Sequence, residues 1–152
     1  MRRFWDGLAG GLLVLWIGGI WAIGYVAAPV LFANLGDKQL AGMLAGRLFA
    51  VMAWIGIAAA AYLLIYRFAR DGGAALKTLF FWAVALMLAL TLAGHFGIQP
   101  IMQSLKDQAM PHAVMQSVFA DRFARWHGVS SILYLIQSVL GLLLVWRSGL
   151  AK

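Results

Sequence analysis

Apolar residues occupy this 152-residue chain in long runs, and charged residues stand only between the runs. The runs cover residues 7–36, 48–66, 78–105 and 126–146, and His95 and His127 are the only side chains within them that gain charge near neutral pH. A hydrocarbon core about 30 Å thick needs roughly 20 apolar helical residues. We therefore expect one membrane span in each run, at about residues 8–32, 48–66, 78–99 and 126–146.

This pattern predicts an all-α, polytopic membrane protein that forms a single domain over residues 1–152, a four-helix bundle without an internal repeat. Charged residues make up 11% of the chain and hydrophobic residues 64%, whereas a soluble domain has about 25% charged residues. The first run is also much longer than the roughly 7–15 apolar residues of a cleaved signal peptide. We expect that run to stay in the protein as a helix.

The segment 100–125 is longer than a simple connection between two helices. Pro111 can open a helix as a first-turn residue, and Asp121 and Arg125 have the spacing of an ion pair on one helix face. Another face would carry an apolar stripe at helical period, formed by Met115, Phe119, Phe123 and Trp126. We therefore expect a helical extramembrane extension that runs into the fourth span.

The net charge is +7, from twelve Lys and Arg and five acidic residues, all Asp. The basic residues stand at the ends of the apolar runs instead of clustering on one face, which indicates contact with a lipid bilayer and no nucleic-acid binding. Seven of the twelve lie on the side that carries both termini, and five lie on the other. Because basic residues are enriched in cytoplasmic segments, we expect both termini in the cytoplasm.

Several glycines have the spacing that lets helix backbones approach closely. Gly7 and Gly11 form one such pair in the first span, Gly42 and Gly46 form another, and Gly56 continues the second along its helix. The partner helix can belong to the same chain, to a second copy or to another membrane protein. A homo-oligomer or a membrane partner that binds these glycine faces is therefore expected.

Polar side chains form one stripe in each of the last two spans. The stripe of the third span contains Thr91, His95 and Gln99, and that of the fourth contains His127, Ser131, Tyr134, Ser138 and Gly141. Polar groups in hydrocarbon turn towards the bundle interior or a wet cavity. We expect both stripes to face inward, towards each other, with the two histidines at similar depth near the outer membrane surface.

Two histidines at one depth could bind a metal, act as axial ligands of haem or relay protons. Alternatively, each imidazole bonds to backbone, headgroup or water. The outer segment adds Met110, His112 and Met115, and thioether with imidazole suits copper(I), although methionine also fills gaps in apolar cores. The chain has no cysteine, so a metal would need other ligands. Arg47 either extends to the interface or binds an anionic headgroup.

The sequence contains no glutamate, phosphate loop, HExxH or GxSxG motif. We therefore name no catalytic residue and do not expect an enzyme. The favoured hypothesis is a membrane protein that binds or passes a small solute or metal ion. Its outward-facing polar cleft would lie between spans three and four, lined by His95, His127, Arg47, Thr91, Gln99, Ser131 and Tyr134. A haem-binding membrane oxidoreductase, with the two histidines as ligands, and an accessory subunit of a larger membrane complex are the alternatives.

Three short segments carry a family resemblance. They are APVLF at residues 28–32, AGRLF at residues 45–49 and FARWHGVS at residues 123–130. Their order along the chain resembles the transmembrane protein 205-like family, which corresponds to domain of unknown function 4149. The resemblance implies a small four-helix membrane protein without an established activity in its bacterial members, and hence a place in the bacterial inner membrane.

Overall fold

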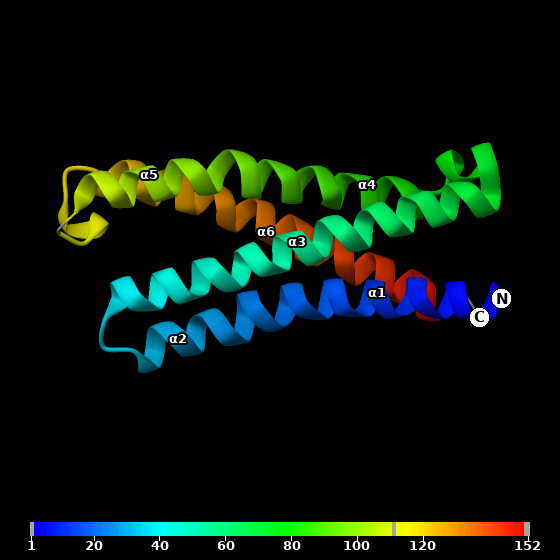
Figure 1. Cartoon of the computed structure of the whole chain (residues 1–152), viewed down its shortest axis with the longest axis horizontal. Helices are drawn as coiled ribbons and strands as arrows, with labels where there is room; N and C mark the ends of the chain where they lie inside the picture. Colours follow the sequence, from blue (N-terminus) through cyan, green and yellow to red (C-terminus); the bar gives the residue numbers. More distant parts are fainter. Residues whose placement is uncertain (1, 111, 151–152) are drawn as a thin grey trace.

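The computed structural model describes residues 2–110 and 112–150, and all regular elements in these two segments are helices (Figure 1). In the first half of the chain, α1 (Arg2–Ala22) continues through a π-helical turn, η1 (Ile23–Ala27), into α2 (Ala28–Asn34). A three-residue loop then leads into the long helix α3 (Lys38–Asp71). The side chain of Asp37 caps α3, because its Oδ1 accepts hydrogen bonds from the backbone N–H groups of Gln39 and Leu40.

The second half of the chain has the same order of elements. After the 3₁₀ turn η2 (Gly72–Lys77), helix α4 (Leu79–Leu92) continues through a π-helical turn, η3 (Ala93–Ile98), into α5 (Gln99–Ala109). A connection that contains the short 3₁₀ turn η4 (Val114–Gln116) then leads into the long helix α6 (Ala120–Leu150).

Four continuous helical segments are long and apolar enough to cross a membrane, as the sequence predicts: Arg3–Asn34, Lys38–Lys77, Leu79–Ala109 and Ala120–Arg147. The protein is therefore a multi-pass membrane protein. Each segment is longer than its expected apolar span. Many large apolar side chains are exposed, among them Val14 and Ile65 at 67% and 69%, as expected for helices whose outer faces contact lipid instead of water.

The extension before the fourth span is only partly as expected. Its first part is α5, which continues the third span, and its last part is the start of α6. The stripe predicted from Met115 onwards is wrong at its beginning, because Met115 lies in η4 and Phe119 in a turn. The Ser117 hydroxyl accepts a hydrogen bond from the Phe119 N–H, a local bond that competes with a helix. Pro111 lies outside the described residues.

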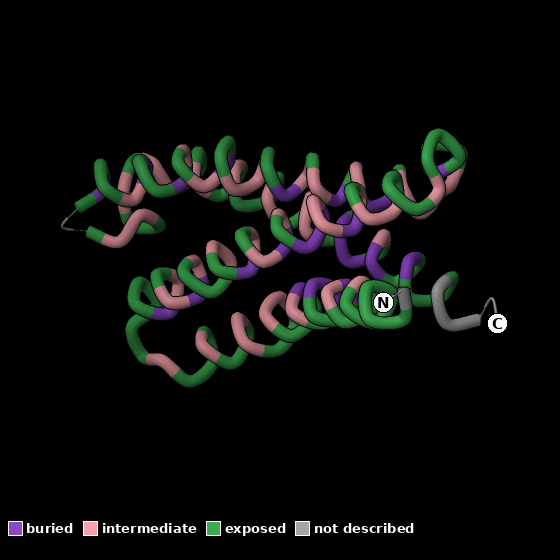
Figure 2. Tube along the Cα trace, turned by 45° about the vertical axis from the view of Figure 1, so that its right-hand side comes forward, coloured by how far each residue is buried: buried purple, intermediate pink, exposed green. Residues whose placement is uncertain are grey.

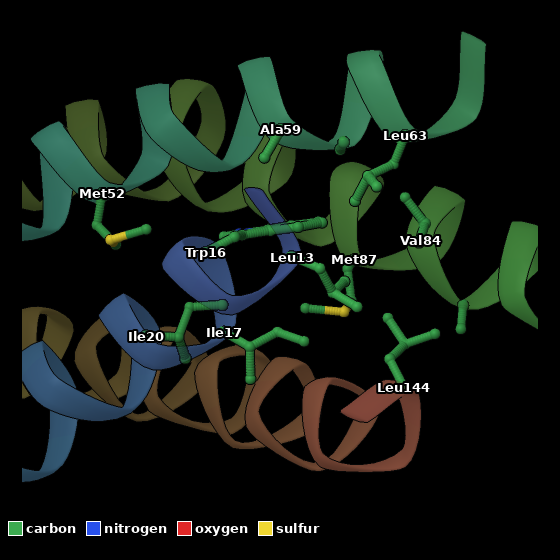
Figure 3. Close-up of a cluster of buried hydrophobic side chains, with 12 residues drawn as sticks. Leu13, Trp16, Ile17, Ile20, Met52, Ala59, Leu63, Val84, Met87 and Leu144 are labelled. Carbon is green, nitrogen blue, oxygen red and sulfur yellow. The ribbon is translucent and has the colours of Figure 1, made fainter. Parts of the chain in front are cut away.

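The four long helices form a closed ring of contacts, in which α1 packs on α3, α3 on α4, α4 on α6 and α6 on α1. The described chain ends lie at the same end of the bundle (Figure 1). Buried positions gather along the facing sides of the helices (Figure 2). The core centres on Trp16 of α1, which lies beneath α3 with Met87 of α4 and Leu144 of α6 nearby (Figure 3).

The two halves share an order of helix, π turn, helix and long helix, although their sequences show no repeat. Pro29 and Pro100 each follow a π turn as the second residue of the next helix. Tyr25 of the first π turn contacts α6, and His95 of the second contacts α3. The first π turn also packs on α3 and the second on α6, so each π turn contacts both long helices.

Polar contacts join the N-terminal end of α1 to the C-terminal end of α3. Asp6 of α1 accepts hydrogen bonds from the Tyr66 hydroxyl at 2.7 Å and from the Arg70 guanidinium at 2.9 Å. Arg67 and Arg70 also form ion pairs with Asp71. These are all the ion pairs of the described residues, so the pair expected between Asp121 and Arg125 does not form.

The glycines that pack inside the chain are mostly not those of the predicted motifs. A Cβ at Gly7, Gly11 or Gly46 would meet nothing within 4 Å, whereas one at Gly56 would press on Trp16. A Cβ at Gly24 would press on Tyr134. The predicted spacing therefore leaves its first glycine pair open to the surroundings, whereas Gly56 and Gly24 make room for large aromatic rings of neighbouring helices.

Candidate functional site

His95 lies in the π turn η3, half-buried in the third membrane-spanning segment. Its ring stands edge-on to Trp54 of α3, with 5.4 Å between ring centroids, and edge-on to Phe96 at 4.8 Å. Within the described residues its imidazole has no hydrogen-bond partner, which leaves both ring nitrogens open to a ligand. An ionisable side chain inside a span marks a candidate functional site.

The position of His95 follows from Pro100. A proline in a helix has no N–H to donate to the carbonyl four residues earlier, and its ring clashes with that carbonyl. For Pro100 this is the carbonyl of Phe96, and for Pro29 it is that of Tyr25. Both helices widen into a π turn at that point, a local rearrangement often found at functional sites.

Two further predicted residues lie outward of His95, nearer the loops between α2 and α3 and after α5. Gln99 is half-buried four residues beyond His95. Arg47 is exposed and precedes Trp54 by seven residues, so the two share one face of α3 two turns apart. His95 and Trp54 therefore form a candidate site between α3 and the π turn, with Gln99 and Arg47 farther outward on the same two segments. The His95 ring contacts the second span through Trp54, and the π turn that carries it also packs on α6 of the fourth span.

The inner part of the predicted stripe on the fourth span holds α6 against α1. The Tyr25 hydroxyl donates to Ser138 Oγ at 3.0 Å, and the Tyr134 hydroxyl donates to the Ile20 carbonyl. Gly141 lies against Ile17 of α1. These side chains face the first span, so they do not form a cleft with the stripe of the third.

The outer part of the stripe faces away from the bundle. His127 is exposed and its ring stacks on Phe123 of the same helix, with 6.0 Å between centroids and 9° between planes. The Ser131 hydroxyl donates to the His127 carbonyl. His95 and His127 therefore have different ring neighbours on different helices. These separate surroundings do not support haem ligation by both histidines, which stays a prediction.

Thr91 of α4 contacts Gln137 of the fourth span, a residue outside the predicted site. The Thr91 hydroxyl is shared as a donor between Gln137 Oε1 at 3.2 Å and the Met87 carbonyl of its own helix at 2.8 Å. Both Thr91 and Gln137 are more than nine-tenths buried. Gln137 does not lie on the helix face that carries His127 and Tyr134. It is, however, the only amide side chain of the fourth apolar run, and this could have marked it as an inward-facing polar residue.

The predicted copper ligands of the outer segment are spread over an exposed connection. Met110, His112 and Met115 are all exposed, and the Met110 sulfur accepts a hydrogen bond from the Gln39 amide at 3.6 Å. Within residues 2–110 and 112–150, His and Asp side chains form no group of three or more that could hold a metal ion. A methionine–histidine copper site here stays a prediction.

Comparison with known families identifies the chain. The model of a family described as a domain of unknown function, DUF4149, matches residues 11–111, which are 101 of the 152 residues. The protein belongs to the DUF4149 family. The match confirms the predicted resemblance to domain of unknown function 4149, whereas similarity to transmembrane protein 205 stays a prediction. No curated protein and no solved structure matches the chain.

The part of this DUF4149 protein that matches the family includes His95, Trp54, Arg47 and Gln99. Both π turns and both prolines also fall within it. Helix α6 lies beyond the match, and with it His127 and Gln137. The candidate site around His95 therefore belongs wholly to the family region.

Proposed function

We propose that this protein binds a small solute or a metal ion at His95, in the half of the membrane opposite its termini, without converting it chemically. The observation that carries the proposal is the imidazole itself, which lies in a π turn of a membrane span without a hydrogen-bond partner in the described residues. Placing an unpaired polar group in hydrocarbon costs free energy, and a bound ligand would offset that cost.

The surroundings of His95 support binding over catalysis. Trp54 and Phe96 flank the imidazole with aromatic rings, while Arg47 and Gln99 add hydrogen-bond donors on the outward side. No second acid or base lies beside the imidazole among its ring neighbours. With both termini in the cytoplasm of a bacterial inner membrane, as the distribution of basic residues favours, this site opens towards the outer surface.

Replacing His95 with alanine is expected to abolish ligand binding and leave the fold intact. The test purifies the protein from its native membrane, measures retained small molecules by native mass spectrometry and metals by elemental analysis, and then titrates it with zinc(II) and copper(I). His112→Ala is the matched control, because it removes an exposed imidazole from the outer connection. Binding that survives His95→Ala, or that disappears only in His112→Ala, would contradict the proposal.

A second candidate function is that of an accessory subunit in a larger membrane complex. The observation that favours it is the open face of α1, where a Cβ at Gly7, Gly10 or Gly11 would meet nothing within 4 Å. Gly7→Leu with Gly11→Leu should then release a partner from a pull-down in mild detergent. The same band pattern in wild-type and variant samples would argue against an accessory role through this face.

A further inference from the structure

A hollow of about 340 Å³ lies along the start of α6 and includes none of the residues around His95. It is lined by Arg122, Arg125, Trp126 and Val129. These positions are spaced i, i+3, i+4 and i+7, so they form one continuous face of the helix. Three of them are exposed, and Trp126 is half-buried. The hollow is thus an open surface that combines two cations with two apolar side chains.

The two guanidinium groups are not neutralised within the described protein. Its ion pairs involve only Arg67 and Arg70, both at the other end of the bundle. Asp121 is the acidic residue nearest in sequence, and no ion pair joins it to Arg125. Two exposed arginines without a carboxylate partner attract an anion, and the planar guanidinium matches the oxygens of a phosphate in a two-pronged hydrogen bond.

The position of the hollow along α6 fits the surface of a membrane. Arg122 and Arg125 are the last charged residues before the apolar run that begins at Trp126. Tryptophan is enriched where a span meets the headgroups. Because a helix rises about 1.5 Å per residue, Arg122 lies roughly 10 Å nearer the water than Val129. The hollow therefore changes from charged to apolar in the direction of the hydrocarbon.

We propose that this face of α6 binds an anionic phospholipid, with its phosphate on Arg122 and Arg125 and its glycerol and acyl region against Trp126 and Val129. A free phosphate ion would use the two arginines and leave the apolar half of the hollow without a contact. A phospholipid covers both halves and carries the charge that complements the arginines. The lipid belongs to the leaflet on the side opposite the two termini.

The test compares lipid binding by two variants that lose the same charge. Delipidated protein in detergent is titrated with phosphatidylglycerol and with phosphatidylcholine, and bound lipid is counted by native mass spectrometry. Arg122→Gln with Arg125→Gln is expected to weaken phosphatidylglycerol binding roughly tenfold or more, because both charge-assisted, two-pronged hydrogen bonds to the phosphate are lost. Lys77→Gln with Arg147→Gln, both exposed near the other end of the bundle, removes the same charge from outside the hollow and should leave it within about twofold.

An equal loss of phosphatidylglycerol binding in the Arg122/Arg125 and Lys77/Arg147 glutamine variants would overturn the proposal, since it would reflect net charge alone. Displacement of phosphatidylglycerol by millimolar inorganic phosphate, or equal binding of phosphatidylcholine, would overturn the assignment to an anionic lipid. Arg122→Lys with Arg125→Lys covers the case of a glutamine variant that does not fold. This lysine variant keeps the charge and loses the two-pronged geometry, so it should bind several-fold more weakly; unchanged binding in it would count against phosphate recognition by these arginines.

Discussion

Replacing Gly56 with alanine is expected to lower the free energy of unfolding by about 1–3 kcal/mol, the usual cost of forcing an extra group into a packed core. A Cβ at this position would stand 2.5 Å from Nε1 of Trp16 and 3.1 Å from two further atoms of the same ring. Trp16 is 1% exposed and lies at the centre of the core (Figure 3). The ring has no free space to move into, so helices α1 and α3 must separate. Thermal unfolding in detergent micelles measures the loss.

Two other glycines provide matched controls for this change. Gly46 lies in the same helix with nothing within 4 Å of its Cβ position, so Gly46→Ala should be neutral or stabilising, by up to about 1 kcal/mol. At Gly19 the added Cβ would meet the flexible end of the Met52 side chain, which can turn away, and the loss should be smaller than at Gly56. A similar loss at Gly46 and Gly56 would show that steric contact with Trp16 is not the cause.

Replacing Thr91 with valine is expected to destabilise the contact between α4 and α6 by about 0.5–2 kcal/mol, the range for hydrogen bonds between helices in membranes. The change leaves the Gln137 side chain, 8% exposed, without its hydrogen-bond partner. An unsatisfied buried amide costs more than the absence of both polar groups. The double variant Thr91→Val with Gln137→Leu should therefore be more stable than Thr91→Val alone. Unfolding of the wild type, both single variants and the double variant completes the cycle.

Ser131→Ala is the control for this cycle, because the exposed Ser131 hydroxyl bonds only to the carbonyl of His127 in its own helix. It should leave stability unchanged. If the losses of unfolding free energy in Thr91→Val and Gln137→Leu simply add in the double variant, Thr91 and Gln137 do not stabilise each other. The helices would then be held together by apolar packing alone.

The number and approximate place of the spans could be predicted because bilayer thickness sets the length of an uncharged helical run. The true ends of the helices could not. The third segment was expected to end at residue 99, before Pro100, yet it continues to Ala109. A widened turn accommodates the proline, and nothing in the apolar pattern around it distinguishes a widened turn from a helix end.

The neighbours of each helix face were also beyond sequence analysis. Stripes at helical spacing indicate that Tyr134 and Ser138 turn inward, but not that they turn towards α1. His95 could be selected from the sequence because it is a polar residue inside an apolar run, whereas its neighbour Trp54 looks like any other apolar residue. In a bundle with apolar residues on every side, hydropathy does not identify the helix that each face contacts.

The two widened turns also change how insertions and deletions act in this protein. A π turn holds about one residue more than an α-helical turn. Removing one residue from Ala93–Ile98 would close the widened turn into an ordinary helical turn, so the deletion would be absorbed there. Met102 and Leu105, both buried on α5, would keep their places against the core, whereas the same deletion in an ordinary stretch of helix would rotate everything beyond it by about 100°. A one-residue gap in this stretch, when family members are aligned, therefore records the loss of a widened turn and not a changed helix face.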